Sequence, residues 1–367
     1  MGIIIKKYGD LTTPTPAYGG KVYQCFSPSK WLHFLCDKDG KNLIPLSGVT
    51  GVLKKAIDKS QPLMRWAVKL ALTRARALML AQGLGPDGAI QLFESELDAI
   101  LKAAKSADAE VLEDAGQCGH QAHEFIDRVC KSILANDEKK LVELLANWPD
   151  DERACNGAIA ALSFFVAHNV RVIKSEFRCL SLEHKCCGTG DSLALVDSCG
   201  DPACCSQQTP FFDRLSYLDF KTSNGLYISY LFQASIYVKA HEEEFPERGE
   251  IVDRWILRLD KETAEFDPWH AEGREAHAED LHGYLCCLNL VRAMDVTQAR
   301  VDAILDARKA IDAERKACEK LERDKVRCPK ADDYKGVRLT KCLPDGTQCE
   351  ACKQIYEVKH LTVDNGT

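Results

Sequence analysis

The sequence predicts an α/β fold, in which a mixed central sheet follows a large helical N-terminal region and precedes C-terminal helices. The first observation is a block of apolar residues at helical spacing that occupies residues 47–168. The second is a change to strand-like runs, which are residues 170–183, 191–198, 213–222, 250–260 and 263–269. The third is the return of helical spacing at residues 227–245, 274–294 and 297–325. Alternation of this kind is typical of a sheet covered by helices.

Within the helical block, turn residues separate individual helices. The predicted segments are residues 47–58, 61–83, 88–105, 108–134, 137–147 and 152–168. The chain before them alternates short apolar runs with turns and reads as strands or a hairpin. We therefore expect one compact unit with four regions, which are an N-terminal hairpin at 1–46, a helical region at 47–169, a core at 170–295 and a C-terminal helix with a cysteine-containing tail at 296–367.

Composition places the chain among soluble globular proteins. Hydrophobic residues make up 46% and charged residues 28% of the 367 positions. No apolar run approaches the roughly 20 residues of a membrane helix, and the N-terminus lacks a signal-peptide core. We therefore expect no membrane partner, reduced cysteines and a cytoplasmic location, in a bacterium or a phage-infected host cell.

The net charge of −7 does not favour nucleic acid globally, so such a partner would need a local basic patch. One candidate lies in the first predicted helices, where a single acid, Asp58, accompanies seven basic residues. They are Lys54, Lys55, Lys59, Arg65, Lys69, Arg74 and Arg76. The segment reads either as a phosphate-binding surface or as a solvated helix face.

The residues that indicate chemistry are Asp191 on one predicted strand, and Asp219 and Lys221 on the next. Residues i and i+2 of a strand share a face, so Asp219 and Lys221 point the same way and Phe220 points into the opposite layer. If the two strands pair as a hairpin, Asp191 and Asp219 meet near one end of the sheet. Neighbouring carboxylates repel one another, and Mg²⁺ or Mn²⁺ relieves that repulsion. Asp-x-Lys alone is nevertheless a common tripeptide.

Four further residues strengthen this interpretation by their order in the chain. His123, on a predicted helix, offers a nitrogen ligand that would favour Mn²⁺, although surface and core histidines are common. Glu176 lies on the strand before Asp191 and offers a carboxylate to the metal or to the lysine. Gln233 and Tyr237 share one face of the helix after Lys221, where they can brace the lysine or contact DNA.

This ordered set resembles the PD-(D/E)XK nuclease superfamily, which has a restriction-endonuclease-like core, and most closely its RecB-type branch with phage exonucleases. The matching pieces are Gly119–His123, Glu176, Gly188–Asp191, Leu218–Ser223 and Gln233 to Tyr237. Ser47–Leu53, followed by Trp66, is similar to the segment that precedes the core in phage members. The segment from Cys199 to Phe212, between the two Asp strands, is longer than a tight hairpin needs.

The resemblance implies a catalytic metal held by His123, Asp191, Asp219 and the backbone carbonyl of Phe220. It implies that Lys221 is catalytic and that the remaining residues support the site or contact DNA. These are Glu176, Gln233, Tyr237, Thr222 and Ser223. It also implies hydrolysis of DNA phosphodiesters, often from an end and often on single strands.

The cysteines suggest two further metal sites. Cys328, Cys342, Cys349 and Cys352 offer four thiolates for Zn²⁺ or an iron–sulfur cluster. Some RecB-type relatives hold such a cluster with one cysteine before the core and three after it, which makes Cys25 or Cys36 an alternative first ligand.

A second set brackets the Asp191 strand and reads as a zinc knuckle that staples the long hairpin. It contains Cys186, Cys187, Cys199, Cys204 and Cys205. Adjacent cysteines on a strand point to opposite faces, so only some of the five can share an ion. Reduced thiols without a metal are the alternative for both sets.

Together these features predict a divalent-metal-dependent DNA exonuclease that acts on DNA ends or single strands in replication, recombination or repair. A recombination or replication protein is the expected protein partner. A structure- or site-specific endonuclease on the same core is the nearest alternative. The alternative of another class is a non-catalytic DNA-binding factor in recombination or packaging.

Overall fold

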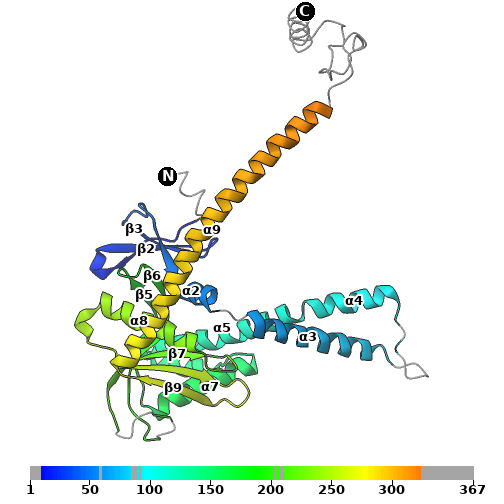
Figure 1. Cartoon of the computed structure of the whole chain (residues 1–367). Helices are drawn as coiled ribbons and strands as arrows, with labels where there is room; N and C mark the ends of the chain where they lie inside the picture. The colour runs from blue at the N-terminus through cyan, green and yellow to red at the C-terminus, as the bar shows by residue number, and fades with distance from the viewer. Residues whose placement is uncertain are drawn as a thin grey trace, which may run out of the picture. The chain divides into compact units, whose positions relative to one another are not determined.

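The computed structural model describes residues 10–57, 60–83, 90, 92–201, 204–205 and 210–323. The chain divides into two units, Met1–Val291 and Arg292–Thr367. The first unit has a mixed α/β architecture built on one nine-stranded sheet (Figure 1). The predicted α/β class with a mixed sheet is therefore confirmed. No helix in the described parts of the chain is both long and apolar enough to span a membrane.

The strands of the sheet run in the order β1-β2-β3-β4-β6-β7-β8-β9, and β5 pairs with the other edge of β6. Their bounds are β1 Thr15–Ala17, β2 Val22–Ser27, β3 Leu32–Cys36, β4 Ile44–Gly48, β5 Arg171–Ser181, β6 Cys186–Val196, β7 Arg214–Lys221, β8 Asp253–Leu259 and β9 Phe266–Glu272. The pairs β4–β6 and β7–β8 are parallel, and the other pairs are antiparallel. The strands of the N-terminal hairpin thus belong to the same sheet as the core strands.

One edge of β6 is divided between two partners. Cys186 and Cys187 pair with the end of β4, whereas Ser192 to Val196 pair with β7. Beyond Leu218, β7 leaves β6 and continues alongside β8 only. Asp191 stands at this branch point, because it immediately precedes the first residue of β6 that pairs with β7.

Helices cover both faces of the sheet. Their bounds are α2 Val49–Ala56, α3 Ser60–Ala81, α4 Glu94–Lys105, α5 Ala107–Leu134, α6 Glu138–Ala146, α7 Glu152–Ala167, α8 Ile228–Glu244 and α9 Arg274–Arg323, with 3₁₀ turns η1 Tyr18–Gly20 and η2 Pro246–Arg248. Residues of α2, α8 and the start of α9 form one core with the sheet, and residues of α5, α6 and α7 form another core. α3 and α4 lie side by side as a helical pair that continues into α5 (Figure 1).

The strand alternation predicted for the Asp-x-Lys segment is confirmed. Tyr217 packs in the core beneath α8, whereas Leu218 and Phe220 pack in the core beneath α5 and α7. The predicted start of β6, residue 191, is wrong by five residues. The strand starts at Cys186 and includes Gly188–Gly190, whose two glycines are more typical of a turn. Gly188 is required there, since a Cβ at this position would lie 2.3 Å from the hydroxyl of Tyr237 on α8.

The prediction of two C-terminal helices is wrong, because a single helix, α9, runs from Arg274 to Arg323. The residues at the predicted break, Met294 to Thr297, include neither glycine nor proline, and so nothing in the backbone ends the helix there. In the second unit α9 is exposed and carries local ion pairs, as its interleaved charges predict. Lys309 lies 3.0 Å from Asp306, and Arg315 lies 3.1 Å from Asp312.

Close packing of α5 against the end of β7 depends on Gly119. A Cβ at Gly119 would lie 2.7 Å from Oγ1 of Thr222, the residue directly after β7. His123 follows one turn later on the same helix, so this contact sets how far the histidine stands from the sheet. Gly116 lies in the same helix and has no heavy atom within 4 Å of the corresponding Cβ position.

Alanine substitutions at these two glycines are expected to have opposite effects on stability. Gly119→Ala pushes α5 away from Thr222 and should lower the free energy of unfolding by about 1–3 kcal/mol. Gly116→Ala removes a flexible residue from an exposed helix interior and should raise it by up to about 1 kcal/mol. Urea denaturation of both variants checks this pair. Equal effects of the two substitutions would contradict the close approach of α5 and β7.

Candidate metal centre and active site

Three predicted site residues converge at the branch point of the sheet. His123 on α5, Glu176 on β5 and Asp191 on β6 each place a ligand atom within 4.8 Å of the other two. The Nδ1 atom of His123 lies 3.8 Å from Oδ2 of Asp191. Two carboxylates and one imidazole form a donor set that fits a divalent cation such as Mn²⁺ or Mg²⁺.

The two carboxylates of this cluster belong to neighbouring antiparallel strands. Ser175 pairs with Ser192 and Phe177 pairs with Gly190, so Glu176 stands opposite Asp191. Like charges in directly opposed positions destabilise a sheet. The backbone of Glu176 also has a φ of 44°, which a residue with a side chain seldom adopts. Repulsion and backbone strain at one position are typical of a functional site.

The environment changes the proton affinities of this cluster. Desolvation, together with the charges of Asp191 and Asp127, raises the pKa of Glu176 to about 7. Burial lowers the pKa of His123, and the charge of Asp191 offsets only part of this effect. At neutral pH the imidazole is therefore unprotonated, which is the form that binds a metal.

Asp219 lies beside this cluster and pairs with the predicted lysine. Its Oδ2 atom lies 2.7 Å from Nζ of Lys221, and its Oδ1 atom accepts a hydrogen bond of 3.1 Å from the hydroxyl of Tyr217. Asp219 is only 1% exposed, and desolvation raises its pKa to about 6. Among the described residues, the metal-compatible group does not include Asp219, whose carboxylate instead contacts Lys221 and Tyr217.

Lys221 is held by groups from three elements. Its Nζ atom donates to Oε1 of Gln233 at 3.2 Å and lies 5.0 Å from the ring centroid of Tyr230, both on α8. The Nε2 atom of Gln233 in turn donates to the hydroxyl of Tyr237 at 3.2 Å and to Oγ1 of Thr50 on α2 at 3.4 Å. The predicted bracing of the lysine by Gln233 and Tyr237 is present in this geometry.

Opposing influences act on the proton of Lys221. Burial works to lower its pKa, but the charges of Asp219 and Asp191 outweigh burial and raise the pKa overall. The amine is therefore a cation at neutral pH. A group of this kind stabilises negative charge and does not accept a proton.

The remaining core residues occupy structural positions around the site. The backbone N–H of Phe220 donates to Oδ2 of Asp191 at 2.7 Å, which fixes the end of β7 against β6. Thr222 packs against Gly119, and the hydroxyl of Ser223 donates to the carbonyl of Gly225 at 2.8 Å. Tyr230 donates to the Ser223 hydroxyl at 3.1 Å and so links this turn to α8.

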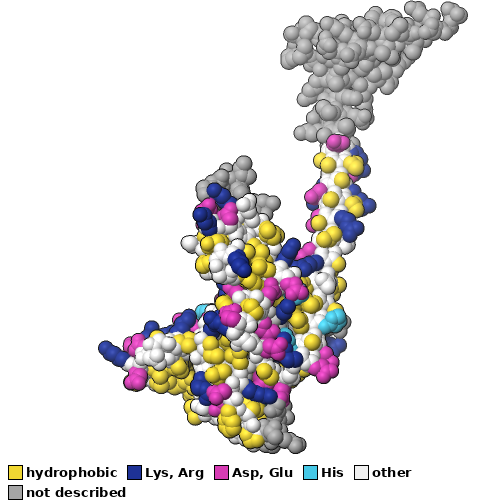
Figure 2. Space-filling view, turned by 90° about the vertical axis from the view of Figure 1, so that its left-hand side faces the viewer, with side chains coloured by type: hydrophobic (Ala, Val, Ile, Leu, Met, Phe, Trp, Pro, Cys, Tyr) yellow, Lys and Arg dark blue, Asp and Glu magenta, His cyan; other side chains and the backbone are white. Residues whose placement is uncertain are grey.

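The predicted basic residues divide into two groups. Lys54 and Lys55 are exposed on α2, and Lys54 lies one turn after Thr50, so it shares a helix face with a residue of the lysine network. Arg65 and Lys69 are exposed on α3, which contacts mainly α4 and α5. Figure 2 shows a face on which Lys and Arg side chains are interspersed with Asp and Glu. This face therefore carries no broad region of one charge.

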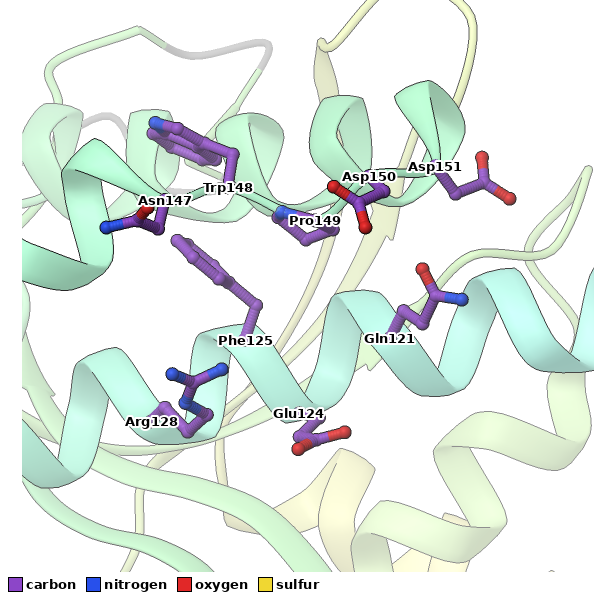
Figure 3. Close-up of a pocket in the computed structure, with 9 residues that line it drawn as sticks. All are labelled: Gln121, Glu124, Phe125, Arg128, Asn147, Trp148, Pro149, Asp150 and Asp151. Carbon is purple, nitrogen blue, oxygen red and sulfur yellow. The ribbon is translucent and has the colours of Figure 1, made fainter.

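A separate hollow lies on another face of α5. It is lined by Gln121, Glu124, Phe125, Arg128, Asn147, Trp148, Pro149, Asp150 and Asp151 (Figure 3). Phe125 stacks on Trp148 with ring centroids 4.9 Å apart. The lining includes three carboxylates and one guanidinium and contains no residue of the metal cluster. Its charge is unsuited to a nucleic-acid backbone.

The predicted cysteine sets have different outcomes. Cys328, Cys342, Cys349 and Cys352 lie outside the described residues. Cys25 and Cys36 are buried together in a small apolar cluster formed by β2 and β3. Cys186 and Cys187 are buried in cores and are absent from the described metal-compatible groups. Cys199, Cys204 and Cys205 instead converge with His168, a residue that spacing within the cysteine set did not identify.

Several residues of the site had not been predicted from the sequence. Thr50 and Tyr230 join the lysine network, and Asp127 accepts a hydrogen bond of 2.7 Å from Ser175 next to Glu176. Tyr230 lies three residues before Gln233, a spacing that puts both on one helix face. Thr50 lies within the segment similar to phage members, but no spacing rule connects it to Gln233.

Comparisons with known proteins do not place the chain in a family. No protein-family model matches it, and no curated protein matches its sequence significantly.

The raised pKa of Glu176 leads to a pH-dependent stability. The folded protein holds the Glu176 proton more tightly than the unfolded chain, where the pKa is about 4.3. Its contribution to stability is therefore complete below about pH 4 and lost as pH rises through about 7. In EDTA, Glu176→Gln should raise the melting temperature at pH 8 and change it little at pH 4.5.

Mn²⁺ should have the opposite pH dependence in the unsubstituted protein, because it should stabilise the fold more at high pH than at low pH. The ion binds deprotonated carboxylates, so the increase in melting temperature should be larger at pH 8 than at pH 4.5. Glu176→Gln should reduce that increase, and Glu138→Gln, on an exposed helix end, should leave it unchanged. A Mn²⁺ effect that is equal at both pH values would argue against these carboxylates as ligands.

Proposed function

We propose that the protein is a metal-dependent nuclease that hydrolyses DNA phosphodiester bonds. The observation that carries the proposal is the placement of His123, Glu176 and Asp191 within 4.8 Å of one another, beside the 2.7 Å ion pair of Asp219 and Lys221. A divalent-metal site next to a buried cation is suited to a reaction in which negative charge develops on a phosphate. The order of these residues in a mixed sheet supports a PD-(D/E)XK core.

The residues divide the chemical tasks among themselves. His123, Glu176 and Asp191 hold the cation, with Asp219 and the carbonyl of Phe220 as further ligands in the resemblance. When bound, Mg²⁺ or Mn²⁺ polarises the phosphate and activates a water. Lys221, protonated next to Asp219, stabilises charge on the scissile phosphate. Gln233 and Tyr237 hold its amine in position, and Thr50 restrains Gln233 from α2.

Cleavage from DNA ends is the form of activity that the resemblance favours. The α3–α4 pair packs against α5, the helix that carries His123, and offers a surface that guides a strand toward the site. An endonuclease would use the same catalytic residues, and a non-catalytic DNA-binding factor would not need them.

The experiment that tests this function is a digestion assay with matched variants. End-labelled linear and closed circular single-stranded DNA are incubated with Mg²⁺, Mn²⁺ or EDTA. Lys221→Met removes the cation and should lower cleavage by about 10²–10³-fold while keeping the melting-temperature increase in Mn²⁺. Asp191→Asn should remove both the cleavage and the Mn²⁺ effect. Lys239→Met, on α8 and paired with Glu183 at 2.9 Å, is the control and should keep both.

The outcomes separate the candidate functions. Digestion of linear DNA alone supports an exonuclease, and cleavage of closed circles establishes an endonuclease on the same core. DNA binding without cleavage in either metal would establish the non-catalytic factor. Full activity of Lys221→Met and Asp191→Asn would refute the proposed site.

Lys54 provides a test of where the DNA backbone runs. Because it lies on the helix face of Thr50, one turn from the lysine network, we propose that it binds a substrate phosphate. Lys54→Ala should weaken DNA binding at low salt and reduce the slope of log K against log salt by about one. Lys102→Ala, exposed on α4, is the control. An identical salt slope in both variants, measured by fluorescence anisotropy, would place the DNA elsewhere.

A further inference from the structure

A second group of potential metal ligands lies at the base of the β6–β7 connection. His168, Cys199, Cys204 and Cys205 each offer one ligand atom, and these four atoms lie within 4.8 Å of one another. Nε2 of His168 lies 3.1 Å from Sγ of Cys204, and Sγ of Cys199 lies 3.5 Å from Sγ of Cys205. Three sulfurs and one nitrogen therefore surround one small volume.

The imidazole of His168 is fixed in the form that a metal requires. Its Nδ1 atom lies 2.9 Å from the backbone carbonyl of Asp197, which can only accept, so Nδ1 carries the proton. The unprotonated Nε2 is then directed at the sulfurs. The ring is completely buried and stacks on Phe164 with ring centroids 4.2 Å apart. A backbone carbonyl that orients a histidine through its distal nitrogen is the usual second partner of a metal ligand.

The two adjacent cysteines are held by backbone hydrogen bonds to Asp201. The backbone N–H groups of Cys204 and Cys205 both donate to the carbonyl of Asp201, at 3.1 and 2.8 Å. At the base of the connection, the N–H of Ser198 donates to the carbonyl of Phe211 at 2.9 Å. Asp197 holds the adjacent backbone, because its carboxylate accepts from the N–H of Asp213 at 2.8 Å. The sulfurs therefore converge through backbone structure that does not depend on contacts between them.

We propose that His168, Cys199, Cys204 and Cys205 bind one structural Zn²⁺ ion. Tetrahedral zinc has bonds of about 2.3 Å to sulfur and about 2.0 Å to nitrogen, which separates its ligand atoms by roughly 3.5–3.8 Å. The observed distances of 3.1 and 3.5 Å need only small shifts to reach these values. Three cysteines and one histidine are a common set for structural zinc, and the narrow spacing fits one ion better than a cluster of several irons.

A zinc ion here would tie the end of α7 to the connection between β6 and β7. His168 follows α7, which packs in the core beneath the sheet, whereas the cysteines belong to the connection between β6 and β7. The site lies at the opposite end of the β6–β7 hairpin from Asp191, since the ladder runs from Ser192 and Leu218 to Val196 and Arg214. The zinc ion would fix this connection without contributing to the catalytic cluster. Zinc binding can therefore be tested independently of nuclease activity.

The alternative use of these thiols is a disulfide bond between Cys199 and Cys205. Such a bond requires a sulfur separation of about 2.05 Å, well below the 3.5 Å present between these atoms. A disulfide lowers the mass of the intact chain by two hydrogens and prevents alkylation of both cysteines until a reductant is added. Zinc prevents alkylation until a chelator is added, so the two alternatives are distinguishable.

The test uses the full chain, purified without added metal and transferred to buffer without reductant before alkylation. Peptide mapping after iodoacetamide treatment should show that Cys199, Cys204 and Cys205 react slowly, and that a strong zinc chelator makes them react quickly. Exposed Cys286 should react quickly in both cases. Rates that the chelator leaves unchanged at all three cysteines, or protection that only a reductant removes, would overturn the proposal.

Metal analysis of matched variants gives the stoichiometry. Cys204→Ser with Cys205→Ser should lower the zinc content by one ion per chain. Cys286→Ser with Cys287→Ser, another adjacent pair on α9, should leave it unchanged. This comparison also separates the site from zinc bound by other cysteines of the chain. Unchanged zinc in a folded Cys204/Cys205 variant would contradict the proposal, and the alkylation test on the unsubstituted chain decides the matter if that variant does not fold.

Discussion

Two carboxylates face one another across β5 and β6, and the repulsion between them is the constraint around which the candidate site is arranged. Glu176 and Asp191 occupy opposed positions in the ladder, and the pKa of Glu176 rises to about 7. In a protein without a cation this arrangement is unfavourable, because the charge of Asp191 opposes ionisation of Glu176. His123, delivered by α5, supplies an uncharged ligand and adds no repulsion. A bound divalent cation would relieve this repulsion and make the same arrangement stabilising.

The branching of β6 makes the arrangement possible. If β7 paired with β6 along its whole length, Asp191 would stand directly opposite Asp219 in the ladder. Because β7 leaves β6 after Leu218, the Asp219–Lys221 pair lies beside the acid pair but contacts α8 and the core. Three glycines allow the helices and strands around the site to pack closely. At Gly119, Gly188 and Gly190, a Cβ would lie within 3.0 Å of a neighbouring side chain.

Sequence patterns predicted the parts of the structure that depend on local periodicity. Alternation along β7 gave the common face of Asp219 and Lys221, and helical spacing gave the pairing of Gln233 with Tyr237. The patterns could not show that Glu176 stands opposite Asp191, because that register depends on a bulge between Val172 and Lys174. Nor could they join His168 to the cysteines, since this contact forms only when α7 packs against the sheet. The single helix α9 was missed because the polar residues at the predicted break, Asp295 and Thr297, are compatible with both a loop and an exposed helix.

The β6–β7 hairpin connects the two proposed metal sites. One end carries Asp191 and Asp219, and the other end leads into the connection that holds Cys199, Cys204 and Cys205. Diffraction from Mn²⁺-soaked crystals, at a wavelength where manganese scatters anomalously, tests whether the first end binds a cation. We expect an anomalous peak within bonding distance of Nδ1 of His123 and of the carboxylates of Glu176 and Asp191. A map with no peak there, or with manganese only at other positions, would contradict this expectation.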